Sequence, residues 1–205
     1  MTERILVVIF VLLFLILLQN FLHILPYLAD SVLRARGSTA LENSVRVRSD
    51  RDIIALILLI PLNLIIYHYK IYSPDFLQAF SPDAGFWIST GVIMSFLFLR
   101  WILTIWMKPR RHADNYMDAY RSGYSFFILM MMAILPSIGL LSVFKASPDA
   151  VRVVVIVEMI VLYVLYLFRR TQILSSYCST LTTFLYLCAL EFLPLGLLIS
   201  SAVVF

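Results

Sequence analysis

Residues 122–144 read SGYSFFILMMMAILPSIGLLSVF and contain no charged side chain. At about 1.5 Å per residue, a helix over this stretch is roughly 34 Å long, which is enough to cross the roughly 30 Å hydrocarbon core of a bilayer. The apolar residues follow one another without the alternation of a barrel strand. We therefore expect a membrane-spanning helix here.

Apolar stretches of this kind recur along the whole chain. The 205 residues are 62% hydrophobic and only 14% charged, and the mean hydropathy is +0.95. A soluble globular domain has about 25% charged residues, and a disordered chain has far fewer large apolar residues. The composition excludes both classes and predicts an all-α polytopic membrane bundle that forms one domain over residues 1–205. Six spans are expected, at residues 5–28, 53–72, 85–107, 122–144, 150–168 and 178–203.

The positive charges predict the orientation of these spans. Because cytoplasmic loops carry an excess of Lys and Arg, the more basic side should face the cytoplasm, which places both termini outside it. The net charge of +4 is then explained by orientation and by the headgroups of the lipid bilayer, and no nucleic acid partner is expected. Four basic residues lie on the outer side, and eleven lie on the inner side: Arg34, Arg36, Arg46, Arg48, Arg51, Lys108, Arg110, Arg111, Arg121, Arg169 and Arg170.

The tripeptide Ser-Pro-Asp occurs three times, at residues 73–75, 81–83 and 147–149. Ser is a good N-cap, Pro suits the first helical position, and Asp is favourable at the positive end of the helix dipole. We expect the second copy to start the third span and the third copy to start the fifth. The first copy predicts a short interfacial helix over residues 74–80.

Three charged residues fall within predicted spans: Arg100, Glu158 and Glu191. A charge at the centre of a bilayer costs about 2.5–3.5 kcal/mol on insertion scales, so each of them needs a partner or a purpose. Glu191 lies close to Pro194, which cannot donate a backbone hydrogen bond and so frees the carbonyl of Leu190. The sequence leaves three interpretations of Glu191 open: a proton site, a cation ligand, or a structural group that locks helix packing. As a structural group, Glu191 would be either protonated and hydrogen-bonded or paired with Arg100.

Other polar and kinking residues lie in the predicted spans. Glu158 and His68 are expected at similar depths, where they would form either a proton relay or a plain interhelical hydrogen bond. Arg100 would either snorkel toward the inner end of its span or pair with a glutamate. Helix kinks are predicted at Pro61, Pro136 and Pro194.

The inner loop offers one weak enzymatic pattern. His112, Asp114 and Asp118 are close in sequence and would in principle hold a metal, as an enzyme acting on lipid requires. No nucleophile elbow, zinc-protease motif or phosphate-binding loop accompanies them. We therefore expect a solvated basic loop, with no catalytic residue, metal or cofactor.

The run LYLCALEFLPL at residues 185–195 resembles a family of uncharacterised multi-pass inner-membrane proteins typical of the Bacteroidota, known as a domain of unknown function. The resemblance implies a bacterial inner-membrane location and emphasises Cys188, Glu191 and Pro194. It implies no activity.

Small size, short loops and missing catalytic motifs favour a non-enzymatic subunit or accessory protein of a larger inner-membrane assembly, with other integral membrane proteins as partners. The alternative is a small ion- or proton-coupled transporter or channel that uses Glu191, Glu158 and Arg100. A third and weaker hypothesis is an intramembrane lipid-modifying enzyme at the inner loop.

Overall fold

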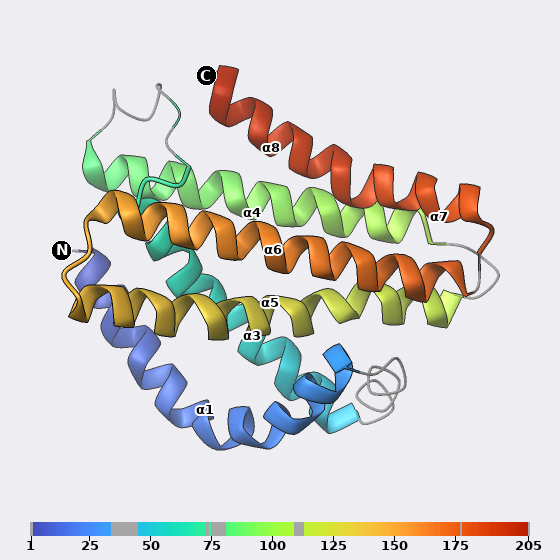
Figure 1. Cartoon of the computed structure of the whole chain (residues 1–205), viewed down its shortest axis with the longest axis horizontal. Coiled ribbons are helices and arrows are strands. Elements are labelled where there is room, and N and C mark those ends of the chain that lie inside the picture. Colours follow the sequence, from blue (N-terminus) through green and yellow to red (C-terminus); the bar gives the residue numbers. More distant parts are fainter. Residues whose placement is uncertain are drawn as a thin grey trace.

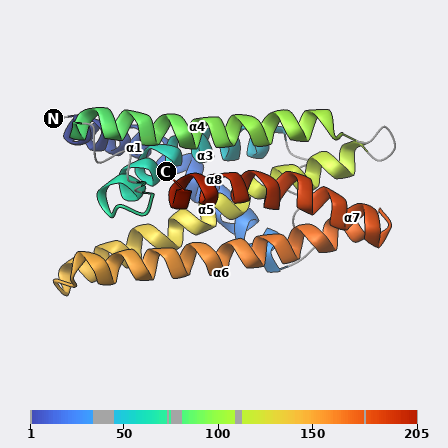
Figure 2. The same ribbon diagram turned by 90° about the horizontal axis from the view of Figure 1, so that it is seen from above.

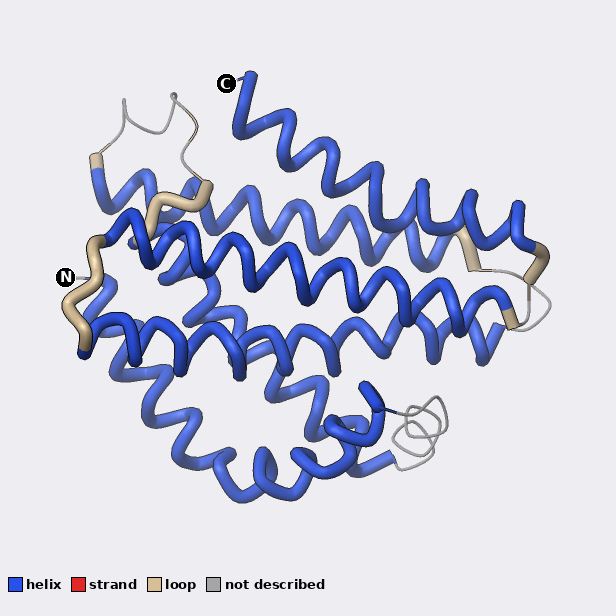
Figure 3. Tube along the Cα trace, viewed as in Figure 1, coloured by secondary structure: helices blue, strands red, loops and turns tan. Residues whose placement is uncertain are grey.

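The computed structural model describes residues 2–33, 45–72, 74, 81–108, 113–176 and 178–204. Within these ranges the chain forms seven α-helices and one π-helical turn, without a strand (Figure 1). Helices make up nearly all of the described trace, and loops lie only at its ends and turns (Figure 3). The elements in chain order are α1 (Thr2–Leu33), α3 (Val45–His68), α4 (Pro82–Trp106), α5 (Ala113–Val143), α6 (Pro148–Ser175), α7 (Thr180–Leu187), η2 (Cys188–Phe192) and α8 (Leu193–Val204).

Four described helices are long and apolar enough to cross a membrane. They coincide with the last four predicted spans, and the fourth is built from α7, η2 and α8 in succession. The prediction of apolar helices is therefore confirmed for this part of the chain. The four segments are Ala84–Trp106, Ala119–Val143, Pro148–Ser175 and Thr180–Ala202.

The N-terminal third differs from the prediction. Helix α1 is bent by 61° between Ile5–Leu13 and Leu18–Pro26, so it adds a fifth span only if the bent pair counts as one. The predicted span 53–72 lies in α3, which begins earlier and ends at His68 and is not among the four spans. The described residues thus support four spans, or five with the bent pair, and the count of six stays a prediction.

Helix α3 also takes up residues that were predicted for a loop. Arg46, Arg48 and Arg51 lie within its first two turns. Arg51 is fully buried, and its guanidinium bonds the carboxylate of Asp52 at 2.8 Å. An arginine is tolerated there because its charge is neutralised by its neighbour.

Helix α5 lies at the centre of the packing and contacts α1, α3 and α6. Helices α5 and α6 form an antiparallel hairpin, and α1 and α3 lie against α5. Seen from above, α4 runs along one side of the bundle and α6 along the other, with α5 and α8 between them (Figure 2). Because α4 and α6 lie apart, a side chain that joins them must cross the bundle. The main apolar core is formed by α1, α3, α5 and the start of α6, and its fully buried members include Ile24, Leu28, Ile128, Met131, Ile134 and Val155.

The turn between α5 and α6 is held by local capping. Lys145 adopts the left-handed region, with φ of 50°, and the next residue, Ala146, donates its N–H to the carbonyl of Leu141 at 3.0 Å. This is the Schellman arrangement that ends many helices. Ser147 then accepts a hydrogen bond on its hydroxyl from the N–H of Ala150 at 3.3 Å, and α6 begins.

Two of the Ser-Pro-Asp copies start helices as expected. Ser147 is the N-cap of α6 and Ser81 is the N-cap of α4, with Pro at the first helical position in both. Ser81, unlike Ser147, makes no side-chain capping bond. The first copy lies outside the described residues apart from Pro74, and so does the rest of the predicted interfacial helix over 74–80.

Candidate functional site

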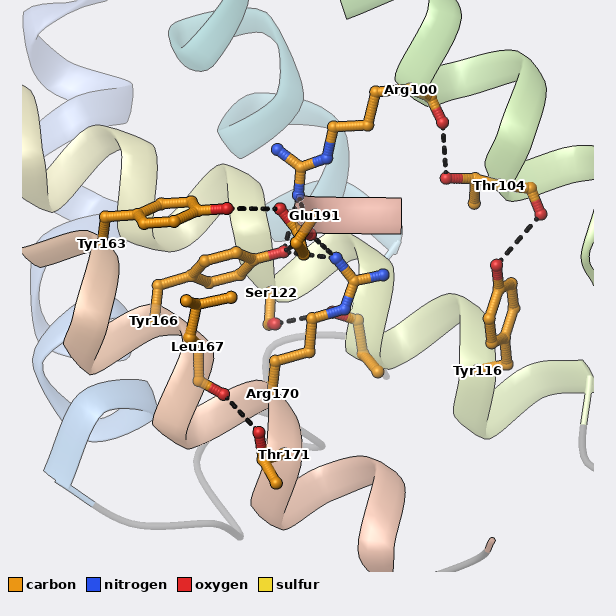
Figure 4. A network of polar contacts seen from close by, with 11 residues as sticks. Arg100, Thr104, Tyr116, Ser122, Tyr163, Tyr166, Leu167, Arg170, Thr171 and Glu191 are labelled. Atoms are coloured by element: carbon orange, nitrogen blue, oxygen red, sulfur yellow. Dashed lines mark hydrogen bonds and ion pairs between the residues drawn. The ribbon is translucent and has the colours of Figure 1, made fainter. Parts of the chain in front are cut away.

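Arg100 and Glu191 meet inside the bundle, although they are 91 positions apart in sequence (Figure 4). Nη2 of Arg100, on α4, lies 2.7 Å from Oε1 of Glu191, on η2. The side chain of Glu191 is 2% exposed and that of Arg100 is 20% exposed. Of the interpretations that the sequence left open, the structure therefore shows the ion pair: Arg100 reaches from α4 to the adjacent η2 instead of snorkelling along its own helix.

A second arginine, Arg170, bonds the same carboxylate. Its Nη1 forms an ion pair with Oε1 of Glu191, and its side chain is only 1% exposed. The prediction had placed Arg170 in a loop after residue 168, and this is wrong because α6 continues to Ser175. The helix carries this charge into the interior since Glu191 is there to neutralise it.

Tyr166 joins all three charged groups. Its hydroxyl donates to Oε1 of Glu191 at 2.8 Å and accepts from Nη2 of Arg100 at 2.6 Å and from Nη1 of Arg170 at 2.7 Å. A phenol has one hydrogen to donate and room for two acceptor bonds, so its capacity is fully used. Tyr163, one turn earlier on α6, donates to the other carboxylate oxygen, Oε2, at 3.3 Å. Both oxygens of Glu191 are thus bonded.

The carboxylate sits on a π-helical turn, Cys188–Phe192. The N–H of Leu193 bonds the carbonyl of Cys188, five residues earlier. Pro194 explains the wider turn, because it has no N–H for the carbonyl of Leu190 and its ring would clash with that carbonyl in a regular helix. The disturbance that Pro194 predicted is therefore a π turn, and it contains Glu191.

Gly123 provides the space in which these side chains meet. A Cβ at this position of α5 would lie 3.4 Å from the hydroxyl of Tyr166 and 3.5 Å from Nη2 of Arg100. A methyl group would thus just touch both partners, and anything larger would displace them. We call the set Arg100, Tyr163, Tyr166, Arg170 and Glu191 the arginine–glutamate cluster.

A polar connection extends from this cluster toward the end of the bundle. The hydroxyl of Thr104 donates to the carbonyl of Arg100 at 2.8 Å, and the hydroxyl of Tyr116 donates to the carbonyl of Thr104 at 3.2 Å. Burial raises the pKa of Tyr116, which precedes the apolar segment of α5, to about 12. Tyr116 therefore stays a neutral hydrogen-bond donor at any physiological pH.

The cluster is not electrically balanced. It holds two guanidinium groups and one carboxylate, so its formal charge is +1. Among the described residues, no second carboxylate lies within ion-pair distance of Arg100 or Arg170. Nε of each arginine is buried and has no hydrogen-bond partner. The arrangement is thus a rigid cross-link with spare positive charge.

Glu158 has a different environment. Its Oε2 lies 2.9 Å from the hydroxyl of Ser137, which is also 2.9 Å from the carbonyl of Ile134. His68 instead packs its ring edge-to-face against Tyr69, with centroids 5.0 Å apart. No hydrogen bond or ion pair joins Glu158 to His68 in the described part of the chain, so the structure does not bring this predicted pair together.

The remaining predicted positions contribute little. Helices α3 and α5 continue without a break through Pro61 and Pro136. Of the three prolines, only Pro194 follows a change from α-helix to π-helix. His112 lies outside the described residues. Asp114 and Asp118 lie at the start of α5, but their side chains are not described.

Sequence reasoning missed three members of the cluster, namely Tyr163, Tyr166 and Arg170. One signal was available: Tyr166 and Arg170 are four residues apart, which places them on the same helix face. Both would have been recognised as one polar face if α6 had been extended by two turns past residue 168.

Four described helices that are long and apolar enough to cross a membrane are typical of a helical membrane protein. The chain belongs to the family described as a domain of unknown function (DUF4271), which matches residues 4–202. This confirms the predicted membership of an uncharacterised family. No curated protein and no solved structure matches the chain.

Proposed function

We propose that the protein is a non-enzymatic subunit or accessory protein of a larger assembly in a bacterial inner membrane, with other integral membrane proteins as partners. The single observation that carries this proposal is the complete engagement of Glu191, the residue best suited to transport. Both of its oxygens are bonded, and its side chain is 2% exposed. A transported cation would have to displace a guanidinium group from it.

The cluster supports a structural role for a second reason. It ties α4, α6 and η2 together, which are distant in sequence. In a low-dielectric interior, one carboxylate between two guanidinium groups holds these elements in one register. A protein built in this way presents a fixed outer surface to its partners.

Location and orientation belong to the same proposal. The resemblance to inner-membrane proteins of the Bacteroidota and the excess of basic residues on one side support an inner-membrane protein with both termini outside the cytoplasm. Single cysteines at Lys108 and Ala146, in a variant without Cys178 and Cys188, test the orientation with an impermeant thiol reagent on spheroplasts. We expect labelling at 146 and not at 108, and the reverse pattern would contradict the orientation.

A small proton-coupled transporter is the second candidate, and one observation favours it. Glu158 lies about 15 Å from the start of α6, within a span, and its one described polar partner is the neutral hydroxyl of Ser137. Unlike Glu191, this carboxyl is not held by an ion pair among the described residues. In this candidate Glu158 moves the proton, and the arginine–glutamate cluster is only its scaffold.

One experiment separates the two candidates. The protein is purified from its native membrane in a mild detergent, and its partners are identified by mass spectrometry. The same preparation is reconstituted alone into liposomes, and proton flux is measured for the wild type and for Glu158→Gln. Stoichiometric partners without flux support the subunit proposal. Flux that is lost in Glu158→Gln, without partners, supports the transporter.

A further inference from the structure

The arginine–glutamate cluster has more positive charge than its own residues neutralise. Two guanidinium groups face one carboxylate, and the described residues supply no further anion to either arginine. An uncompensated charge in a membrane interior costs several kcal/mol, so a negative group that reaches the cluster is strongly favoured there.

The cluster also has unused donors that suit an anion. Nε of Arg100 and Nε of Arg170 are buried and have no hydrogen-bond partner, whereas Nη2 of Arg100 and Nη1 of Arg170 are occupied by Glu191 and Tyr166. The edge formed by Nε and Nη2 is one of the two guanidinium edges that bind an oxyanion through parallel hydrogen bonds. In Arg170 the occupied nitrogen lies off this edge, and in Arg100 only Nε of this edge has no partner. A buried donor without a partner indicates a missing acceptor.

Among the charged members of the cluster, only Arg100 is partly exposed. The side chain of Arg100 is 20% exposed, while those of Arg170 and Glu191 are 1% and 2% exposed. Arg100 lies within the apolar segment Ala84–Trp106, six residues or about 9 Å before its end. Two exposed aromatic side chains of the same helix, Phe98 and Trp101, stack on each other with centroids 5.8 Å apart, so α4 also presents an apolar face at this depth. A ligand that reaches Arg100 therefore comes through lipid.

We propose that Arg100, supported by Arg170, binds the oxyanion headgroup of a singly charged acyl-chain amphiphile. The carboxylate of a fatty acid and the phosphate of an anionic phospholipid share the required chemistry, which is an oxyanion with one negative charge carried on an apolar chain. Binding brings the formal charge of the cluster from +1 to zero. This inference does not depend on whether the protein is a subunit or a transporter.

The test measures binding to delipidated protein in detergent by native mass spectrometry and by thermal shift. Oleate and phosphatidylglycerol are the two anionic amphiphiles, phosphatidylcholine and methyl oleate are the neutral controls, and inorganic phosphate is the soluble anion. We expect one bound oleate or one bound phosphatidylglycerol per protein, and the arm that binds identifies the headgroup. Equal binding of the neutral amphiphiles, equal binding of inorganic phosphate, or no binding at all would overturn the proposal.

Three variants test whether the affinity for the anion follows the formal charge of the cluster. Arg100→Gln leaves a neutral Glu191–Arg170 pair, so it should keep the fold and weaken binding by about tenfold or more. Arg152→Gln removes the same charge at the other end of α6, so it should leave binding unchanged. Glu191→Gln raises the formal charge of the cluster to +2 and should tighten binding. If Glu191→Gln does not fold, the first two variants decide: equal affinities for them would overturn the proposal.

Discussion

The two ends of helix α6 are fixed in different ways. Near its C-terminal end, Tyr166 and Arg170 bond residues of α4 and η2, across sequence separations of 66 positions for Tyr166–Arg100 and 25 for Tyr166–Glu191. Near its start, Ser147 caps the helix across three residues, and Glu158 bonds Ser137 of the adjacent helix across 21. The first end depends on ion pairs and on distant partners, and the second depends on single hydrogen bonds between neighbours.

The two glutamates of these regions depend on different kinds of partner. Glu191 faces two guanidinium groups, so its removal leaves two charges without a partner. Glu158 faces one hydroxyl, and Ser137 retains the carbonyl of Ile134 as an acceptor if Glu158 is removed. Two glutamates of the same chain, both within apolar helices, should therefore respond very differently to the same substitution.

The largest effect is expected for Glu191→Leu. Stranding two arginines should lower the free energy of unfolding by about 3–5 kcal/mol. The matched control is Glu158→Leu, which should cost only about 1 kcal/mol, the typical worth of one hydrogen bond. Unfolding titrations in bicelles measure both values, and similar losses for the two variants would contradict the comparison.

Replacing Arg100 or Arg170 should lower the free energy of unfolding by different amounts. Arg170→Gln should cost about 2–3 kcal/mol, because a fully buried side chain loses charge-assisted bonds to Glu191 and Tyr166. Arg100→Gln should cost less, about 1 kcal/mol, since its partial exposure weakens the pair. The same titrations check the order, and a larger loss for Arg100→Gln would show that Arg170 is not the main partner of Glu191.

The two glycines of α5, Gly123 and Gly139, offer a third contrast. Gly123→Leu should cost about 1–3 kcal/mol, because the side chain would push Tyr166 and Arg100 apart, whereas Gly123→Ala should be nearly neutral. A Cβ at Gly139 meets nothing within 4 Å, so Gly139→Leu should be tolerated. Thermal unfolding in detergent compares the three variants, and a destabilised Gly139→Leu would contradict the assignment.

The smallest effect is expected at the capped start of α6. Ser147→Ala should lower stability by about 0.5 kcal/mol, the lower end of the usual range for an N-cap, because its capping bond is long at 3.3 Å. Ser81→Ala is the control, since Ser81 holds the same position in α4 without a capping bond. Equal losses in thermal unfolding would mean that the hydroxyl of Ser147 does not act as a cap.

The contrast between local contacts and contacts with distant partners also explains what could be predicted from the sequence. The last four apolar segments and the starts of α4 and α6 follow from local composition and capping chemistry, and these predictions are confirmed. Glu191, Arg100 and Pro194 were recognised because a charge or a proline within an apolar run is unusual at any position. Arg170 was not, because its environment depends on where η2 lies after the chain has folded. Whether a terminal arginine is solvated or buried is decided by its partner and not by its neighbours in sequence.

The π turn at Cys188–Phe192 sets the direction in which Glu191 points. A π turn takes up one more residue than a regular turn by widening the helix, so α7 and α8 keep nearly the phase of one continuous helix. Deleting Ala189 would let α7 and α8 join in regular geometry with little change in that phase, but it would move Glu191 around the helix axis relative to α7. The extra residue thus aims the carboxylate, and the length of this span is as critical as its composition.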